Sequence, residues 1–510
     1  MYRGGILPVD PGAARQVKRT GKRQKMGSFR SLDRSAAGSL AARRADAAPS
    51  TRTLARRTAA LVMAGVLALG PMGTAVHAQG GIPLVRDAET EALMRDYAGP
   101  IFDAAGIARQ QVDIVLVNRN DFNAFVADAR RIFINVGVIT DAETPGEVIG
   151  VLAHETGHIT GNHLVRLRQA LANAQIIAVI GAVLGAGAVV AGSSSGSSGV
   201  AQGGAGALTA GAGLAQRSLL AYRRGEESIA DRAALTFLQK TRQSARGMLK
   251  TFARFADQTL FSAQYTDPYA QSHPMPRERL TQLETVARQS PYWDAPEDPQ
   301  LQARHDMVRA KLIAFTAHPN TVARDYPRSD SSLPAEYARA VVTMRTRSRK
   351  EAVAAIDKLI RRQPDNPYFH ELKGQALLES GNPKAAIAPF RQALSLRPRE
   401  AQFQIWLGFA LVAANDNSLL PEAEKILKAG LQVDENSPIG YSQLAIALGR
   451  QGKTAEADVA TARGLMARGD FEAARRYAAR AQKKLKRGTP AWLQADDIVS
   501  YKPPKLPGRS

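Results

Sequence analysis

The hydrophobic pattern of the first half of the chain predicts both strands and helices. Two short apolar runs, 112–118 (VDIVLVN) and 130–139 (RRIFINVGVI), are typical of strands. Upstream of them, the apolar residues of 87–106 recur with the period of a helix. We therefore expect a mostly helical domain with a small sheet.

A further helix is predicted where an apolar run leads into the sequence HETGH. In EVIGVLAHETGH, Val148, Leu152 and Ala153 are spaced so that they face a core. Thr144 is a candidate N-cap, and it is followed by Pro145, a residue favoured at the first helical position. The apolar face of this helix is therefore expected to be buried.

From about residue 334 the hydrophobic pattern repeats. Ala352 and Ala386 are 34 residues apart, and so are Gly374 and Gly408. This is the period of the tetratricopeptide repeat, in which pairs of helices stack and bury a continuous core. We predict an all-α solenoid that ends in a degenerate hairpin at 469–482 and has a core separate from that of the preceding domain.

A segment rich in glycine and alanine interrupts the first domain. Residues 176–192 (IIAVIGAVLGAGAVVAG) form an apolar run that is marginal for a bilayer span, and the return segment 204–222 is only weakly apolar. We therefore interpret 176–215 as a flexible helical hairpin or loop in peripheral contact with a membrane or a membrane-bound substrate. A plain insertion between two helices is the alternative.

The N-terminal region has the pattern of a targeting sequence. Arg56 and Arg57 precede an apolar stretch at 58–78 that ends in small residues. This arrangement predicts a secretory signal peptide that is cleaved after Ala78, and hence an exported protein. An uncleaved N-terminal anchor is the alternative. The long basic segment before the apolar stretch suggests that translation begins at Met26 or later.

Charge and cysteine content exclude several classes of protein. The formal net charge is +22, but residues 1–78 contain 14 Lys and Arg against 3 Asp and Glu, so half of the excess lies in the segment predicted to be removed. No motif with interleaved aromatic and basic residues is present, and we expect no nucleic-acid partner. The chain has no cysteine, which excludes a disulfide framework and thiol catalysis.

The candidate chemistry is concentrated around HETGH. Three of the eight histidines lie within residues 154–163. On a helix, His154 and His158 lie one turn apart on one face, and Glu155 projects beside them. This is the HExxH arrangement, in which two imidazoles bind zinc and the carboxylate takes a proton from water. We predict one Zn²⁺ per chain, with two histidine ligands and Glu155 as the catalytic base.

Two positions compete for the third protein ligand. His163 is one residue short of the third histidine in the pattern HExxHxxGxxH, and on a continued helix it lies opposite His154. It is therefore a candidate for a residue that supports a ligand, or for a surface residue. In the segment 223–238, Glu227 and Asp231 share a helical face. Glu227 is the candidate third ligand, and Asp231 is the candidate hydrogen-bond partner of a ligand imidazole, although without HExxH the segment is an ordinary charged helix face.

HETGH, the later ESIADRAAL and SHPMPRERL at 272–280 together resemble the gluzincin zinc metalloproteases, the family of HtpX and the CAAX prenyl endopeptidase. With its C-terminal repeats, the chain is most similar to the periplasmic branch of that family. The resemblance covers about 79–500. It implies a periplasmic zinc endopeptidase whose ligands and base are those given above, Glu227 included. It extends to an edge strand within 122–139, which such enzymes use to pair with an extended polypeptide substrate.

The same resemblance assigns a role to His273. This residue matches a histidine that takes the fourth zinc position and holds the enzyme inactive. Two alternatives remain: a hydrogen-bond donor to the oxyanion of the tetrahedral intermediate, or a loop histidine beside Pro274 and Pro276.

The predicted fold class is an α+β, zincin-like peptidase domain, mostly helical with a small sheet and an edge strand, followed by an all-α tetratricopeptide-repeat solenoid. We divide the chain into an N-terminal extension with signal peptide, the peptidase domain, a helical connector, the repeat domain and a basic, proline-containing tail, at residues 1–78, 79–295, 296–333, 334–495 and 496–510.

Two functions are compatible with this organisation. The first is an exported zinc-dependent endopeptidase of envelope protein quality control or outer-membrane protein assembly, whose repeats dock polypeptide substrates or the assembly machinery. The second is a repeat-based periplasmic chaperone or scaffold with little or no proteolytic activity. The complete HExxH motif, followed by Glu227 and Asp231, favours the first.

Overall fold

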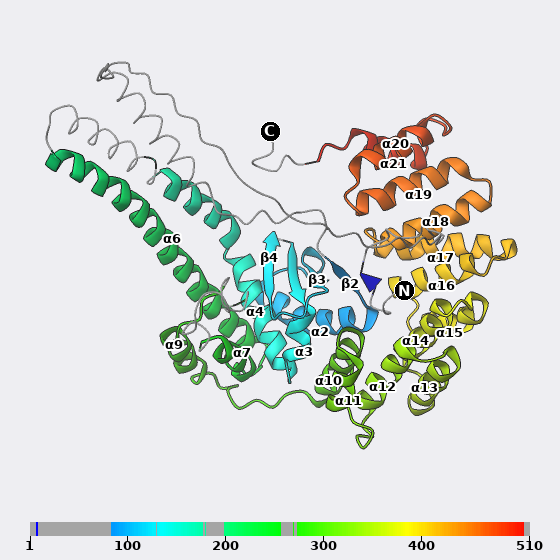
Figure 1. The fold of residues 1–510 in the computed structure, drawn as a ribbon, viewed down its shortest axis with the longest axis horizontal. Coiled ribbons are helices and arrows are strands. Elements are labelled where there is room, and N and C mark those ends of the chain that lie inside the picture. Colours follow the sequence, from blue (N-terminus) through cyan, green and yellow to red (C-terminus); the bar gives the residue numbers. More distant parts are fainter. Residues whose placement is uncertain are drawn as a thin grey trace, which may run out of the picture. The chain divides into compact units, whose positions relative to one another are not determined.

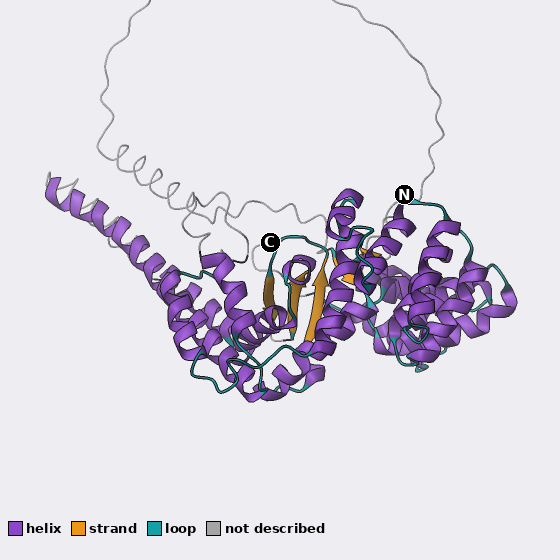
Figure 2. Cartoon of the chain, turned by 90° about the horizontal axis from the view of Figure 1, so that it is seen from below, coloured by secondary structure: helices purple, strands orange, loops and turns teal. Residues whose placement is uncertain are grey.

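The computed structural model describes residues 7–8, 83–128, 130–176, 179, 198–256, 269 and 273–503 (Figure 1). The signal peptide predicted within 1–78 and most of the apolar run 176–192 lie outside these residues. The described part consists of a small sheet with packed helices, followed by paired helices, and this confirms the predicted fold class (Figure 2).

Five strands form one sheet in the order β1-β2-β3-β5-β4. Their bounds are β1 Leu7–Pro8, β2 Leu84–Arg86, β3 Asp113–Val117, β4 Ala124–Asp128 and β5 Arg131–Asn135. β3 and β5 are parallel, and the other neighbours are antiparallel. The strand predicted at 112–118 is β3. Within 122–139, the strand at the edge of the sheet is β4.

The predicted strand at 130–139 is shorter than expected. β5 ends at Asn135, and the helix α3, Val136–Asp141, follows directly. Val136, Val138 and Ile139 are fully buried. A run buried on all sides fits a central strand and a buried helical turn equally well, so its period does not separate the two.

The helices of the first half are α2 Ala88–Ala105, η1 Arg109–Gln111, α3, α4 Pro145–Thr160, α6 Ser198–Lys240, α7 Arg246–Ala256 and α9 Arg277–Ala287, and residues 163–176 are also helical. α4 begins at the predicted N-cap, Thr144, with Pro145 in the first position. Val148, Leu152 and Ala153 are fully buried, as predicted. α4 packs against α2, α7 and β4.

Residues 198–215 of the segment predicted as a hairpin or loop are helical and belong to α6. The same helix continues to Glu227 and Asp231. Among the helices in the described part of the chain, none has an apolar stretch long enough to cross a bilayer.

The second half consists of helices that pack in sequence order. α10 Pro299–Thr316 and α11 Pro319–Asp325 form the connector. Five helix pairs follow: α12 Leu333–Thr346 with α13 Arg349–Arg362, α14 Pro367–Glu379 with α15 Pro383–Leu396, α16 Ala401–Ala413 with α17 Leu420–Val433 (preceded by η3 Asn417–Leu419), α18 Pro438–Arg450 with α19 Thr454–Ala467, and α20 Phe471–Gln482 with α21 Pro490–Ser500. The predicted tail at 496–510 therefore starts too early, because Ala495 and Ile498 are buried inside α21.

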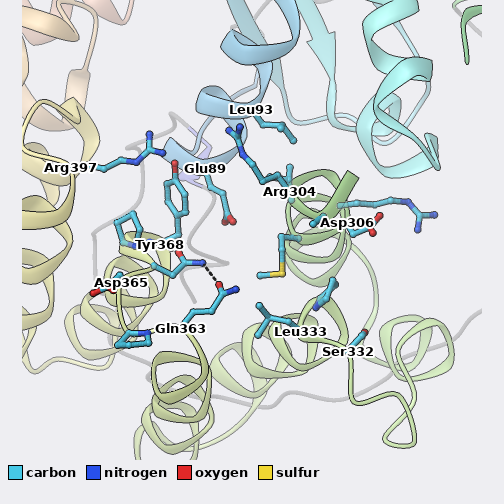
Figure 3. Close-up of a pocket in the computed structure, with 18 of the residues that line it drawn as sticks. Glu89, Leu93, Arg304, Asp306, Ser332, Leu333, Gln363, Asp365, Tyr368 and Arg397 are labelled. Carbon is cyan, nitrogen blue, oxygen red and sulfur yellow. Dashed lines mark hydrogen bonds between the residues drawn. The ribbon is translucent and has the colours of Figure 1, made fainter. Parts of the chain in front are cut away.

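The first repeats share a core with the preceding domain. One buried cluster includes Val85 of β2, Tyr337 of α12 and Phe369 of α14. The prediction of separate cores is therefore wrong for this part of the array. A 34-residue period shows which residues of one repeat face the next repeat. It does not show which part of the chain packs on the first repeat of the array. A cavity of about 880 Å³ lies at the same junction, where Leu93 of α2 and Tyr368 of α14 are among the lining residues (Figure 3).

Candidate metal centre

α4 supplies two imidazoles and a carboxylate to one buried site. His154 and Glu155 are fully buried, and His158 is partly buried. His154 Nε2 and His158 Nε2 are 3.1 Å apart. The helical spacing thus directs one nitrogen of each ring toward a common point, as predicted.

α6 brings a second carboxylate to the same point. It crosses α4 at Gly157, where a Cβ atom would lie 2.7 Å from the carbonyl oxygen of Ala230. The close approach therefore requires glycine. It places Glu227 Oε2 3.4 Å from His154 Nε2, and Glu227 Oε1 3.5 Å from His158 Nε2.

His273, in the loop before α9, completes the group. Its Nδ1 lies 3.2 Å from His154 Nε2 and 3.1 Å from Glu227 Oε2. The ligand atoms of the four residues His154, His158, Glu227 and His273 all lie within 4.8 Å of one another. Donors bound tetrahedrally to zinc at about 2.0–2.1 Å are about 3.3 Å apart. The donor set and its spacing therefore fit a zinc ion.

Asp231 lies behind His154, at the position predicted for it. Its Oδ1 is 3.0 Å from His154 Nδ1. Arg279 of α9 donates from Nε and Nη2 to the two oxygens of Asp231, at 2.6 and 2.8 Å. Burial opposes the charge on Asp231, but the hydrogen bonds with His154 and Arg279 outweigh it and keep the pKa of the carboxyl below its usual value. The anion so held favours a proton on Nδ1 of His154 and leaves the Nε2 lone pair directed at the centre.

Burial and neighbouring charges shift the pKa values of the two histidines of α4 and of the Glu227 carboxylate in different directions. Burial disfavours a charged His154, but the hydrogen bonds to Asp231 and Glu227 outweigh burial and raise the pKa of this imidazole to about 10. Burial dominates at His158 and puts its pKa well below the usual value. At Glu227 burial is again opposed, by His273 and His154, and the pKa of the carboxyl lies well below its usual value. The two histidines of α4 differ in this way because only His154 has a carboxylate beside each of its two ring nitrogens.

Glu155 has the environment of a proton acceptor. Burial raises the pKa of its carboxyl, and the charges of His273 and His154 offset part of this rise. Neither carboxylate oxygen makes a well-aligned hydrogen bond within the described residues. Glu155 Oε1 lies 3.5 Å from His273 Nε2. A buried carboxylate with a raised pKa and no fixed partner, next to a metal site, suits general-base catalysis.

His163 lies beside His158 and not on the far side of α4. The helix ends at Thr160, and Asn162 adopts a left-handed conformation with φ of 53°. The assumption of a continued helix is therefore wrong. The turn brings His163 Nδ1 to 2.7 Å from His158 Nδ1. His163 thus lies beside His158 and is not part of the converging donor group.

Two charged residues of the site were not identified from the sequence. Arg279 lies in the HPMPRERL segment, and Glu226 precedes Glu227. The signal for Arg279 was charge balance, since two buried acids on one helical face need a cation. No local pattern distinguishes Glu226 from a solvated residue, because its role depends on the turn at Asn162.

Comparison with known proteins identifies both halves of the chain. Residues 85–287 match the model of peptidase family M48, and residues 337–402 and 376–438 match the tetratricopeptide repeat. The first match contains every candidate site residue. The second falls on the three helix pairs from α12 to α17.

Several relatives are similar to this chain over more than half of its length. The beta-barrel assembly-enhancing protease of Yersinia pestis is 25% identical over 380 residues, which is 72% of this chain and 74% of the relative. A putative protein of the same name from Vibrio cholerae is 25% identical over 56% of this chain and 58% of its own length. The Escherichia coli K12 protein is 21% identical over 62% of this chain and 64% of its own length. The chain is thus a metalloendopeptidase with a peptidase M48 domain followed by tetratricopeptide repeats.

Proposed function

We propose that the chain is a zinc-dependent endopeptidase of the cell envelope that acts on polypeptides during the assembly and quality control of outer-membrane proteins. The observation that carries the proposal is the convergence of donor atoms from His154, His158, Glu227 and His273 beside the buried carboxylate of Glu155. This is the donor chemistry of a catalytic zinc site, in which three protein ligands leave a position for water. Here three of the groups serve as permanent ligands, and His273 stands at the fourth position.

Each residue has a distinct part in hydrolysis. Zinc, when bound, acts as a Lewis acid that lowers the pKa of water to about 7. Glu155 accepts the proton of that water and delivers it to the leaving amine. Asp231 and Arg279 keep His154 oriented, and Glu227 supplies a negative charge that balances the metal.

The edge strand suggests how a polypeptide is held. β4 lies at one edge of the sheet, and it packs on α4. The backbone of Val126 in β4 contributes to the electrostatic environment of Glu155. An extended peptide paired with the outer edge of β4 would therefore pass the catalytic base, with backbone hydrogen bonds that do not depend on sequence.

The cellular role rests on the relatives and on the repeats. The three relatives above are named as proteases that enhance beta-barrel assembly. We propose a periplasmic location after removal of residues 1–78, docking of substrates or assembly machinery on the repeats, and peripheral membrane contact through 176–215. The tetratricopeptide array supports the docking role, since such surfaces bind polypeptides.

Glu155→Gln separates this proposal from a chaperone with an inactive peptidase domain. The variant should keep one zinc per chain, because Glu155 is not a ligand, and should lose cleavage of an unfolded protein by roughly 10²–10⁴-fold. Metal analysis and gel-based proteolysis, with and without a chelator, measure both properties. Glu143→Gln, an exposed change just before α4, is the matched control and should cleave normally. Full activity of purified Glu155→Gln protein would end the hydrolase proposal.

A further inference from the structure

The two histidines of α4 are supported in different ways. Nδ1 of His154 faces a carboxylate directly, at 3.0 Å from Asp231 Oδ1. Nδ1 of His158 faces a second imidazole, at 2.7 Å from His163 Nδ1. Behind that imidazole stands another carboxylate, with Glu226 Oε2 3.0 Å from His163 Nε2. The carboxylate on the outer side of His158 therefore acts through the ring of His163, whereas Asp231 contacts His154 directly.

The positions of the protons follow from these contacts. An ionised carboxylate only accepts hydrogen bonds, so the nitrogen of His163 that faces Glu226 must carry a proton. In a neutral His163, Nδ1 is then unprotonated and accepts. In the short contact between the two rings, His158 Nδ1 therefore carries the proton and donates a hydrogen bond to His163 Nδ1. This leaves a lone pair on His158 Nε2, which lies 3.1 Å from His154 Nε2 within the donor group.

The local sequence builds this arrangement. At Gly161 a Cβ atom would lie 2.0 Å from His163 Nε2, so the ring fits only beside a glycine. The left-handed Asn162 turns the chain back toward α4. Arg166 Nη2 donates to Glu226 Oε2 at 2.8 Å and holds that carboxylate in place. His163 and Glu226 are 5% and 9% exposed, so water competes little for these contacts.

We infer that His163 and Glu226 are positioning residues that fix His158 in the tautomer with the proton on Nδ1, and so make its Nε2 a metal ligand. They form a relay from a carboxylate through one imidazole to another. The inference rests on the proposed zinc site and assigns the support of its second histidine. The N–H of His163 does not point straight at Glu226, and the two residues interact through the 3.0 Å separation of Nε2 and Oε2.

The affinity for zinc tests the relay without reference to activity. His163→Ala should weaken zinc binding by about 10- to 100-fold, the usual effect of losing a partner of a metal ligand. His163→Asn should recover most of that loss, because Asn Oδ1 takes the place of Nδ1 as acceptor. His318→Asn is the matched control. This exposed histidine also accepts through Nδ1, from Asn320 N at 3.2 Å, and its replacement should change nothing. Competition with a chromophoric chelator gives the affinities.

The outcomes are separable from those of the proposed function. Wild-type protein that binds no zinc would refute the zinc site itself. Tight binding by wild-type protein and by His163→Ala alike would overturn only the relay. Equal losses in His163→Ala and His163→Asn would show that the ring fills space and does not accept a proton.

A second measurement uses the unmodified protein and so does not depend on the folding of a variant. Long-range ¹H–¹⁵N correlation spectra of the zinc-loaded chain should show His158 protonated at Nδ1, and His163 protonated at Nε2 only. A proton on Nδ1 of His163 would leave His158 without its acceptor and would overturn the inference.

Discussion

The metal centre and the junction between α2, α10 and α14 both bury carboxylates, but they neutralise them differently. At the junction, Lys311 Nζ lies 2.5 Å from Asp87 Oδ2 and 3.3 Å from Glu89 Oε2, with all three side chains buried. At the candidate metal centre, Arg279 Nε lies 2.6 Å from Asp231 Oδ2, and its Nη2 lies 3.2 Å from Glu227 Oε2. The point between the donor atoms is faced by imidazole nitrogens, which offer lone pairs.

This difference separates a structural ion cluster from a ligand site. At the junction, a buried lysine neutralises the carboxylates around it, so the cluster needs no further cation. Removing the lysine would leave buried carboxylates without a charged partner. Imidazoles whose outer nitrogens are engaged by Asp231 and His163 present their inner nitrogens as acceptors. Buried carboxylates alone therefore do not indicate a metal site. Such a site is indicated when the nitrogens of neighbouring imidazoles point at the same position as the carboxylates.

The junction also ties the repeats to the peptidase domain. Tyr337 of α12 donates to Glu89 Oε2 at 2.9 Å. Burial raises the pKa of Glu371 in α14 to about 8, although Lys311 lowers it. Glu89 and Tyr368 both line the adjacent cavity, in which Figure 3 shows side chains from the α2 and α14 segments. Residues of the repeats thus contact the buried charged groups of the domain before them.

Replacing the junction lysine should give the largest effect on stability. Lys311→Met leaves buried carboxylates unpaired, and we expect a loss of about 3–5 kcal/mol in the free energy of unfolding. The control is Lys373→Met, which breaks a partly exposed pair with Asp357 (2.7 Å) and should cost less than about 1 kcal/mol. Urea denaturation measures both. Similar losses of unfolding free energy in the two variants would show that the buried ion pairs of Lys311 contribute no more to stability than a surface ion pair.

For the candidate metal centre, the sequence predicts which residues share a face within a single helix. His154, Glu155 and His158 lie within one helical turn and a half, and Glu227 with Asp231 lies on one face of a second helix. Their spacing fixes which side chains share a face before any tertiary contact is known. The comparison with M48 peptidases agrees with this assignment of the domain.

The remaining residues depend on contacts between distant segments. Arg279 reaches Asp231 from 48 positions further along the chain. His163 reaches His158 through the turn at Asn162, which helical spacing does not include. The junction was missed because repeat periodicity describes one repeat against the next, whereas Lys311 and Glu371 belong to the contact that precedes the array.

Glu371→Gln should give a smaller effect that depends on pH. The raised pKa means that folded protein holds a proton on Glu371 between about pH 4.5 and 8, whereas unfolded protein releases it. The contribution of this group is therefore fully present below pH 4.5 and is lost as the pH rises toward 8. Glutamine removes the dependence, so the variant should match the wild type at pH 4 and exceed it by roughly 2 kcal/mol at pH 6.

Thermal denaturation at several pH values measures the effect of this change. Glu278→Gln, an exposed change in α9, is the control and should leave the pH profile unaltered. Parallel profiles for wild-type and Glu371→Gln protein would mean that Glu371 is ionised in the folded chain and that Lys311 neutralises it fully.

His273→Ala should give the smallest effect and should show whether the fourth donor is as permanent as Lys311. Lys311 lies within the helix α10, whereas His273 lies in the loop before α9, held by its N–H to the carbonyl of Tyr269 at 2.7 Å. Its Nδ1 stands among the donors and its Nε2 faces Glu155, so one ring blocks both the water position and the base. We therefore expect His273→Ala to keep its zinc and to raise basal cleavage several-fold.

The direction of the change in activity decides the role of His273. A rise in basal proteolysis, with self-digestion on storage, indicates a ring that must leave before water enters. A fall of about 100-fold indicates instead a donor to the oxyanion, because that is the usual cost of removing one such hydrogen bond. No change in either direction makes His273 a loop residue. His318→Ala, a change at an exposed helix cap, serves as the control for all three outcomes, because its side chain lies outside the donor group.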